Sequence, residues 1–208
     1  MFEPNPNFVH SRFSRLFPFA AVLLLATSIG ITQSVAQAED EVASAQEEEL
    51  LPGHRIDLVN PGFEGGLFGW RVIVEAEQNS ALAAFEAAQN GNMGLRVQDT
   101  LQGEDVTVRS QFYRIRPGGL YRLNFACRVI EGRGVNVFLR FMTVDREPIE
   151  TEHRFMSELP QEPSDWETCT LDAEAPMEAA YVEVYVRTNK RAIVTADFDD
   201  FEIFEVIE

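Results

Sequence analysis

Residues 60–70 read Asn-Pro-Gly-Phe-Glu-Gly-Gly-Leu-Phe-Gly-Trp, a stretch in which turn-forming residues alternate with large apolar side chains. The glycines, the proline and the asparagine stop a helix and permit tight reversals of the chain. Phe63, Phe68 and Trp70 are costly to expose to water, so we expect them to pack into a core. Glu64 lies among them, and its carboxylate needs either a cation or backbone N–H groups as partners.

Outward from this stretch, apolar and polar residues alternate over short segments that end in turn formers. The clearest segment is 121–129, in which every second residue is apolar, as in a half-buried antiparallel strand. Residues 117–119 before it and Gly132-Arg133-Gly134 after it predict turns. Eight or nine such strands without a long helix predict an all-β fold, an antiparallel β-sandwich of two sheets. The other expected strands are 69–74, 95–97, 106–115, 135–144, 166–173, 181–187 and 192–206, and residues 81–88 fit either a helix or a strand.

The chain has two cysteines, Cys127 and Cys169, and both lie on the apolar side of expected strands. In an oxidising compartment such a pair indicates one disulfide. Two buried free thiols are the alternative. We expect the disulfide.

The N-terminal residues have the pattern of a secretory signal. Arg12 and Arg15 precede an apolar run at 16–31, and Ala-Gln-Ala follows at 36–38. We therefore expect a signal peptide at 1–38, an acidic disordered tether at 39–53 and one domain at 54–208. An uncleaved membrane anchor is the alternative. After cleavage, the protein would be secreted or would reside in the periplasm or elsewhere in the cell envelope.

The formal net charge is −17. So acidic a chain is poorly suited to nucleic acid or to an anionic membrane, because phosphate contacts need Lys and Arg. A neutral ligand or a cation suits this charge better. Solubility in an exported protein would by itself also account for it.

Several short motifs follow one another along the chain. In order they are Asn-x-Gly-Phe-Glu at 60–64 with Trp70, Gly-x-x-Gly-Leu-Arg-Val at 91–97, Gln111, Pro-Gly-Gly-x-Tyr-x-Leu at 117–123, Trp166, and Asp199-Asp200. A chain with these motifs in this order resembles the carbohydrate-binding modules of families four, nine and twenty-two, which are galactose-binding-domain-like jelly rolls. The resemblance covers nearly all of 54–208, and it implies two antiparallel sheets and often a structural calcium ion.

The resemblance implies two calcium ligands, Glu64 from the opening motif and Asp199 from the last strand. Ca²⁺ takes six to eight oxygen ligands, and carboxylates together with loop carbonyls supply them. Alternatively, Glu64 caps backbone amides and Asp199 pairs with an arginine. Asp200 has the opposite phase and is expected to face solvent.

The outward-facing rows of the strands contain residues that suit a sugar. Pyranose C–H faces stack on aromatic rings, and hydroxyl groups accept and donate hydrogen bonds to planar polar side chains. A solvated sheet with cross-strand Arg–Glu pairs is the alternative. Trp70 and Trp166 are interpreted as core anchors. The candidate ligand-binding residues are Arg128, Phe138, Arg140, Tyr185 and Arg187.

The sequence has no nucleophile, zinc or phosphate-loop motif, and its histidines form no convincing triad. We therefore expect a non-catalytic protein that binds a polysaccharide or glycan. The first alternative is a structural or protein-interaction domain of the cell envelope, with an envelope protein as its partner. A small jelly-roll glycoside hydrolase or lyase is the second, and it would need two carboxylates facing each other across a groove.

Overall fold

The computed structural model describes residues 53–207, apart from residues 75, 151–155, 158 and 161. The expected signal peptide at 1–38 lies outside the described residues, as does the expected tether at 39–53 except for its last residue. Within the described part of the chain, no helix is long and apolar enough to cross a membrane.

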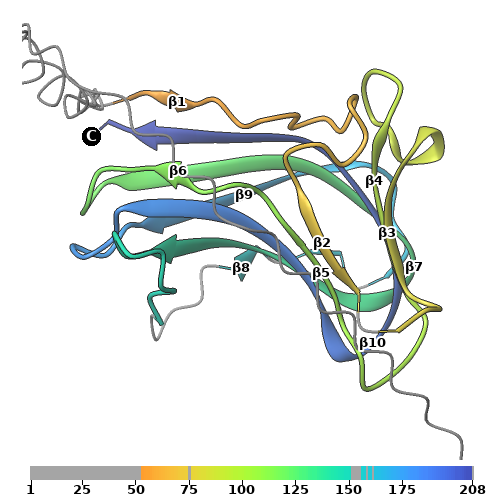
Figure 1. Ribbon diagram of the computed structural model, residues 1–208. Helices are drawn as coiled ribbons and strands as arrows, with labels where there is room; N and C mark the ends of the chain where they lie inside the picture. The colour runs from red at the N-terminus through yellow and green to blue at the C-terminus, as the bar shows by residue number, and fades with distance from the viewer. Residues whose placement is uncertain (1–52, 75, 151–155, 158, 161, 208) are drawn as a thin grey trace, which may run out of the picture. The chain divides into compact units, whose positions relative to one another are not determined.

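In the described residues, strands make up almost all of the regular structure, together with one short 3-10 helix, η1 (Figure 1). Residues 81–88, which fit either state in the sequence, divide between a strand and this helix. In chain order the elements are β1 (Arg55–Ile56), β2 (Arg71–Val74), β3 (Ser80–Ala84), η1 (Phe85–Ala87), β4 (Gly94–Asp99), β5 (Val106–Arg109), β6 (Tyr113–Arg114), β7 (Leu120–Met142), β8 (Met156–Ser157), β9 (Glu167–Glu174) and β10 (Tyr181–Val206).

The strands β7 and β10 form one long antiparallel ribbon that belongs to both layers of the sandwich (Figure 1). In the first layer, the N-terminal half of β7 pairs with β9, and the C-terminal half of β10 pairs with β4 and β1. In the second layer, the C-terminal half of β7 pairs with β8, and the N-terminal half of β10 pairs with β5 and β6. β3 and β2 complete the two layers, next to β4 and β5 respectively. The architecture is the predicted antiparallel β-sandwich.

The predicted turn at 132–134 is wrong, because the chain bends there without reversing. Gly132 and Gly134 have φ values of 72° and 103°, which suit glycine. A Cβ built on Gly132 would lie 1.8 Å from the carbonyl oxygen of Ile193 on the paired strand. The opposing strand shifts register between Thr188 and Ile193 at the same place. Two predicted pairs of strands are therefore the single strands β7 and β10.

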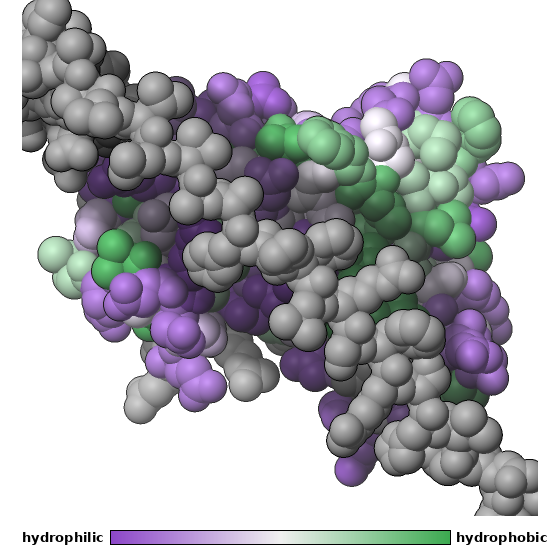
Figure 2. Space-filling view, in the orientation of Figure 1, coloured by the Kyte–Doolittle hydropathy of each residue, from purple (hydrophilic) through white to green (hydrophobic). Residues whose placement is uncertain are grey.

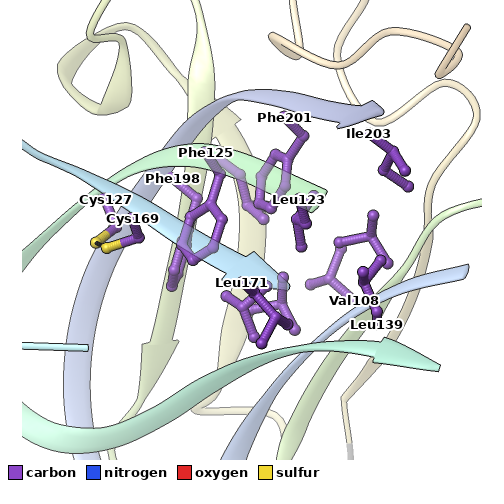
Figure 3. Packing of buried hydrophobic residues seen from close by; sticks show 14 of the residues in the cluster. Val108, Leu123, Phe125, Cys127, Leu139, Cys169, Leu171, Phe198, Phe201 and Ile203 are labelled. Atoms are coloured by element: carbon purple, nitrogen blue, oxygen red, sulfur yellow. Dashed lines mark hydrogen bonds between the residues drawn. The ribbon is translucent and has the colours of Figure 1, made fainter. Parts of the chain in front are cut away.

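The core lies between the layers and is one continuous cluster of buried side chains. Figure 3 shows Phe125, Phe198 and Phe201 of the first layer beside Val108 and Leu139 of the second. These residues lie on the apolar faces of their strands, as the alternation predicted.

The stretch at 60–70 folds over one end of this core. Phe63 and Trp70 are buried with ring centroids 4.9 Å apart, and Trp70 lies 5.3 Å from Phe201. The side chain of Asn60 fixes the loop, since it accepts from Gly65 N and donates to two backbone carbonyls further on. Phe68 was expected in the core, but 71% of it is exposed, because the loop turns this side chain outward.

The two cysteines lie on neighbouring strands with their sulfur atoms side by side (Figure 3). The Sγ atoms are 2.9 Å apart, and both residues are buried free thiols in this structure. The hydrogen bond with Cys169, together with burial, raises the pKa of the Cys127 thiol. The predicted disulfide of the exported protein remains a prediction, and the two residues are placed so that it can form.

We expect Trp70→Ala to destabilise the domain by about 3–5 kcal/mol, because it removes a buried ring from the junction of the loop and the core. Phe68→Ala is the matched control from the same loop, and it should change the unfolding free energy by no more than about 0.5 kcal/mol. Chemical denaturation of both variants measures the difference. Similar losses in the two variants would contradict the packing described here.

We expect the protein purified from an oxidising compartment to contain a Cys127–Cys169 disulfide. Its intact mass should be lower by two hydrogen atoms than that of the reduced protein. Reduction should lower the unfolding free energy by about 3–4 kcal/mol on the loop-entropy account. Cys127→Ser should abolish both effects. Two titratable thiols in the unfolded, unreduced protein would show that the pair stays reduced.

Candidate functional site

The outer face of the second layer brings four of the five predicted ligand residues together. Residues directly opposite each other in an antiparallel pair point to the same face. Phe138 of β7 lies opposite Tyr185 of β10, and Arg140 and Arg187 each follow two residues further along these strands. The four side chains therefore share one face, although β7 and β10 are far apart in sequence. We call this surface the aromatic–arginine face.

The two aromatic rings form the centre of this face. The ring centroids of Phe138 and Tyr185 are 5.8 Å apart, and the ring planes are tilted by 58°. The guanidinium of Arg140 lies over the Tyr185 ring at 5.0 Å, and that of Arg109 lies near it at 6.0 Å. These contacts place two guanidinium groups against the Tyr185 ring, and Phe138 lies beside it.

A cavity of about 490 Å³ opens over this pair of rings. The chain segments at 148–150 and 188–190 form its sides, and all four face residues contribute to its lining. Its size and its mixture of rings, guanidinium groups and amide side chains match those of small-ligand sites. We call it the first cavity.

A buried carboxylate on the same face orients the arginines. Glu183 is 1% exposed and lies between Arg109 and Arg140. Its oxygens are 3.2 and 3.3 Å from Arg109 nitrogens and 3.0 Å from Arg140 Nε. Glu183 lies opposite Arg140 in the β7–β10 register, so the cross-strand Arg–Glu pair considered as an alternative is also present. The pair fixes the guanidinium groups beside the two rings, which are half-buried.

Arg187 has its own buried partner, Asp105, which receives hydrogen bonds from two of its guanidinium nitrogens. This hydrogen bond raises the pKa of Arg187 above its usual range. Sequence reasoning missed Asp105 and Arg109 as partners in this site. Alternation places Arg109 on the polar side of its expected strand, but only the register shows that this strand lies next to Tyr185.

A second cavity, of about 530 Å³, lies at the opposite edge of the same layer. Its lining includes Arg71, Gln111, Phe112 and Arg146. The Arg146 guanidinium is 5.8 Å from the centroids of both Phe112 and Tyr181. No individual residue of this cavity was predicted as a ligand residue, and the signal that could have found it is the outward phase of Tyr181.

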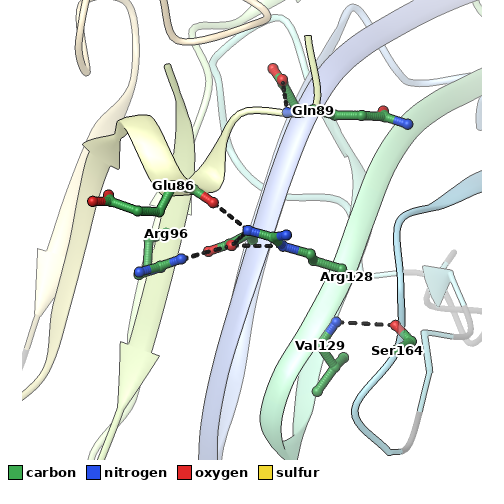
Figure 4. A network of polar contacts seen from close by, with 8 residues as sticks. Glu86, Gln89, Arg96, Arg128, Val129 and Ser164 are labelled. Atoms are coloured by element: carbon green, nitrogen blue, oxygen red, sulfur yellow. Dashed lines mark hydrogen bonds and ion pairs between the residues drawn. The ribbon is translucent and has the colours of Figure 1, made fainter. Parts of the chain in front are cut away.

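Arg128 is the predicted ligand residue that the structure places elsewhere, on the outer face of the first layer. Figure 4 shows Arg96 and Arg128 approaching the same carboxylate, that of Asp197, which is fully buried. Arg128 also donates to the Glu86 carbonyl, and its guanidinium lies 4.8 Å from the Trp166 ring. Trp166, which was expected as a core anchor, is half-buried at this surface. The cluster is a set of ion pairs that joins β4, β10 and β7.

Glu64 and Asp199, the predicted calcium ligands, both bind the loop at 89–93. Glu64 Oε1 accepts from the backbone N–H groups of Asn92 and Met93, and these bonds lower the pKa of Glu64. Asp199 Oδ2 accepts from Gln89 N and Asn90 N. The alternative for Glu64 as an amide cap is therefore present. The alternative in which Asp199 pairs with an arginine is not what the structure shows, because the arginines there, Arg96 and Arg128, pair with Asp197.

Whether these residues could hold a calcium ion can be judged from the space beside Gly62, which has no side chain. Asp199 Oδ1 and Asp200 Oδ1 lie 3.3 and 3.6 Å from the position that a Cβ on Gly62 would take. Burial raises the pKa of Asp199 despite its amide bonds, so a nearby cation would stabilise its charged form. The described residues contain no cluster of three or more acidic, His or Cys side chains with metal-binding geometry. A hard cation here would therefore need backbone carbonyls as further ligands.

Comparisons with known proteins identify the fold. No protein-family model matches the sequence, and no curated protein matches it. Among solved structures, Family 16 Carbohydrate Binding Module-2 superposes with a TM-score of 0.51 and 19% identity, over 71% of this chain and 99% of that one. The CBM22-1 xylan-binding domain from Paenibacillus barcinonensis Xyn10C gives a TM-score of 0.52 and 11% identity, over 76% of this chain and 99% of that one.

A third similar structure is the enzymatically active domain of tailspike protein 4 of bacteriophage CBA120. It gives a TM-score of 0.60 and 10% identity, over 73% of this chain but only 21% of the tailspike chain. At identities this low, the structural similarity shows a shared fold. The described part of the chain has the β-sandwich fold of carbohydrate-binding modules, as the order of its motifs predicted.

Proposed function

We propose that this chain, which has the β-sandwich fold of carbohydrate-binding modules, is an exported, non-catalytic protein that binds a polysaccharide or glycan. The observation that carries the proposal is the aromatic pair Phe138–Tyr185 at the floor of the first cavity. A sugar ring can stack on these side chains, while Arg140 and Arg187, fixed by buried carboxylates, bond its hydroxyl groups. The secretory pattern at 1–38 supports export to the cell surface or periplasm.

The carboxylates in and next to the first cavity favour binding over hydrolysis. A glycosidase needs two carboxyl groups that face each other across the scissile bond. Among the described lining residues of the first cavity, Glu150 is the one carboxylate. Glu183, on the same face, is buried and ion-paired to two arginines, so it is poorly placed to transfer a proton.

An envelope-interaction role is the second candidate, and one observation favours it. Leu82 and Phe85, on β3 and η1, are 43% and 72% exposed. Figure 2 shows hydrophobic surface on the side of the molecule where β3 lies. Exposed apolar residues that gather in one place are typical of protein contacts. This area lies on the first layer, away from the aromatic–arginine face, so the two roles can be separated by mutation.

We expect Phe138→Ala and Tyr185→Ala each to lower the affinity for the best ligand of a polysaccharide panel by about thirtyfold, as loss of an aromatic anchor does. Isothermal titration calorimetry measures this loss. Phe85→Ala is the matched control, because it removes an exposed ring from the other layer and should leave the affinity unchanged. Unchanged affinity in both cavity variants would contradict this binding site. A loss in Phe85→Ala alone would place the sugar site on the first layer instead.

We also propose that a structural Ca²⁺ binds near Glu64 and Asp199 and joins the 60–70 loop to the last strand. Calcium at about one hundred times its dissociation constant should stabilise the protein by about 2.7 kcal/mol, and a chelator should reverse the gain. Thermal melts of the wild type, Glu64→Ala and Asp199→Ala measure it, and each substitution should remove the calcium-dependent part. An unchanged melting temperature at millimolar calcium would exclude the site.

A further inference from the structure

The two cavities of the second layer are connected by a row of side chains that crosses the sheet. Phe138, Tyr185, Arg109 and Arg71 lie directly opposite one another on β7, β10, β5 and β2. All four therefore point to the same face. With neighbouring strands about 4.8 Å apart, the row is about 14 Å long, the length of a short oligosaccharide. The first cavity lies at one end of this row and the second cavity at the other.

The cations along this row are only partly neutralised. Arg109, Arg140 and Arg187 share two buried carboxylates, those of Glu183 and Asp105. Within the described part of the chain, no carboxylate lies within ion-pair distance of Arg71, Arg146 or Lys190, and each of these three lines a cavity. The described lining of the second cavity contains no acidic residue at all. These cations are therefore available to a ligand.

The arginines of the first layer differ from those of the row in their ion pairs. Every arginine on the described strands of the first layer is paired with a carboxylate of the same layer. The pairs are Arg55–Glu202, Arg96–Asp197, Arg122–Asp172 and Arg128–Asp197. Arg133 and Arg191, which also have no ion pair among the described residues, lie at the bend of the ribbon next to Lys190. Among the described residues, cations without an ion pair thus lie at the two cavities and at the bend of the ribbon, in a chain whose net charge is −17.

We propose that the glycan bound by this protein is anionic, a chain that carries carboxylate or sulfate groups, and that it lies along the row from the first cavity to the second. This proposal rests on the glycan-binding function proposed above and adds the chemical class of the ligand. Guanidinium groups bind carboxylate and sulfate oxygens through paired N–H donors. The rings of Phe138 and Tyr185 supply the face on which a sugar stacks. The acidic remainder of the protein repels every polyanion, so the ring contact is what separates an acidic glycan from other polyanions.

The net charge of the whole chain favours a neutral ligand or a cation, and the local arrangement outweighs it for two reasons. Charges separated by more than about 8 Å are largely screened at physiological ionic strength, so a ligand on this face responds mainly to the nearest groups. Among the nearest groups, Arg109, Arg140 and Arg187 are already held in place by buried carboxylates, so little side-chain entropy is lost when a ligand binds these three.

Matched pairs of acidic and neutral polymers test the proposal with the full chain. The pairs are polygalacturonate with its fully methyl-esterified form, for carboxylate, and dextran sulfate with dextran, for sulfate. We expect at least one acidic polymer to bind about tenfold or more tightly than its neutral partner at low salt, with the difference shrinking as salt is added. The pair that shows the difference identifies which anionic group is recognised.

Single substitutions connect the preference to the row. Arg71→Gln, Arg146→Gln and Lys190→Gln should each weaken binding of the acidic polymer about fivefold, the effect of one partly exposed ion pair. Binding of the neutral partner polymer should not change. Arg122→Gln is the control, because it removes an exposed arginine of the first layer. Melting temperatures within the wild-type range confirm that the variants are folded.

The outcomes separate this proposal from the one on which it rests. Equal binding of neutral and acidic polymers would overturn the anionic preference and leave the glycan-binding function intact. Binding to no saccharide of these pairs or of the wider panel would overturn both. Binding of polyglutamate or single-stranded DNA as tightly as the acidic polysaccharide would also overturn the proposal, because charge alone would then account for it.

Discussion

The pairing of β7 with β10 is the interaction on which the rest of this structure depends. The two strands remain hydrogen-bonded from Leu120 opposite Val206 to Met142 opposite Tyr181, through a bend at Gly132. Each half of the ribbon forms the middle of one layer, so both layers grow outward from it. The inner face of the ribbon supplies much of the core, and its outer face carries Phe138 and Tyr185. Fold and site therefore have the same origin.

Much of this arrangement can be predicted from the local pattern of the sequence. The alternation in 121–129 and 181–187 assigns the inward and outward residues correctly, because a strand alternates faces whatever its neighbours are. The outward phase also selected Phe138, Arg140, Tyr185 and Arg187, which the structure brings together. These predictions succeeded because each depends on residues close together in the chain.

Predictions that depend on distant residues fared less well. Arg128 has the same outward phase as Arg140, but its environment is set by Asp197, which a different strand brings beside it. Gly132 and Gly134 read as a turn because glycine permits both a reversal and a bend, and only the approach of the Ile193 carbonyl distinguishes them. Phe68 shows that a large apolar residue in a turn-rich loop need not enter the core. The shared carboxylate of Glu183 likewise depends on the register between strands.

Because β7 and β10 each belong to both layers, neither layer can separate from the other without breaking the same ribbon. Partial opening would expose the common core and interrupt hydrogen bonds in both halves at once, which favours cooperative unfolding of the whole domain. Most of these pairings join residues far apart in sequence, so loop-closure entropy must be overcome before they form, and folding should be slow. Because both layers contain the same two strands, a ligand bound to the outer surface of one layer also stabilises the other layer against unfolding.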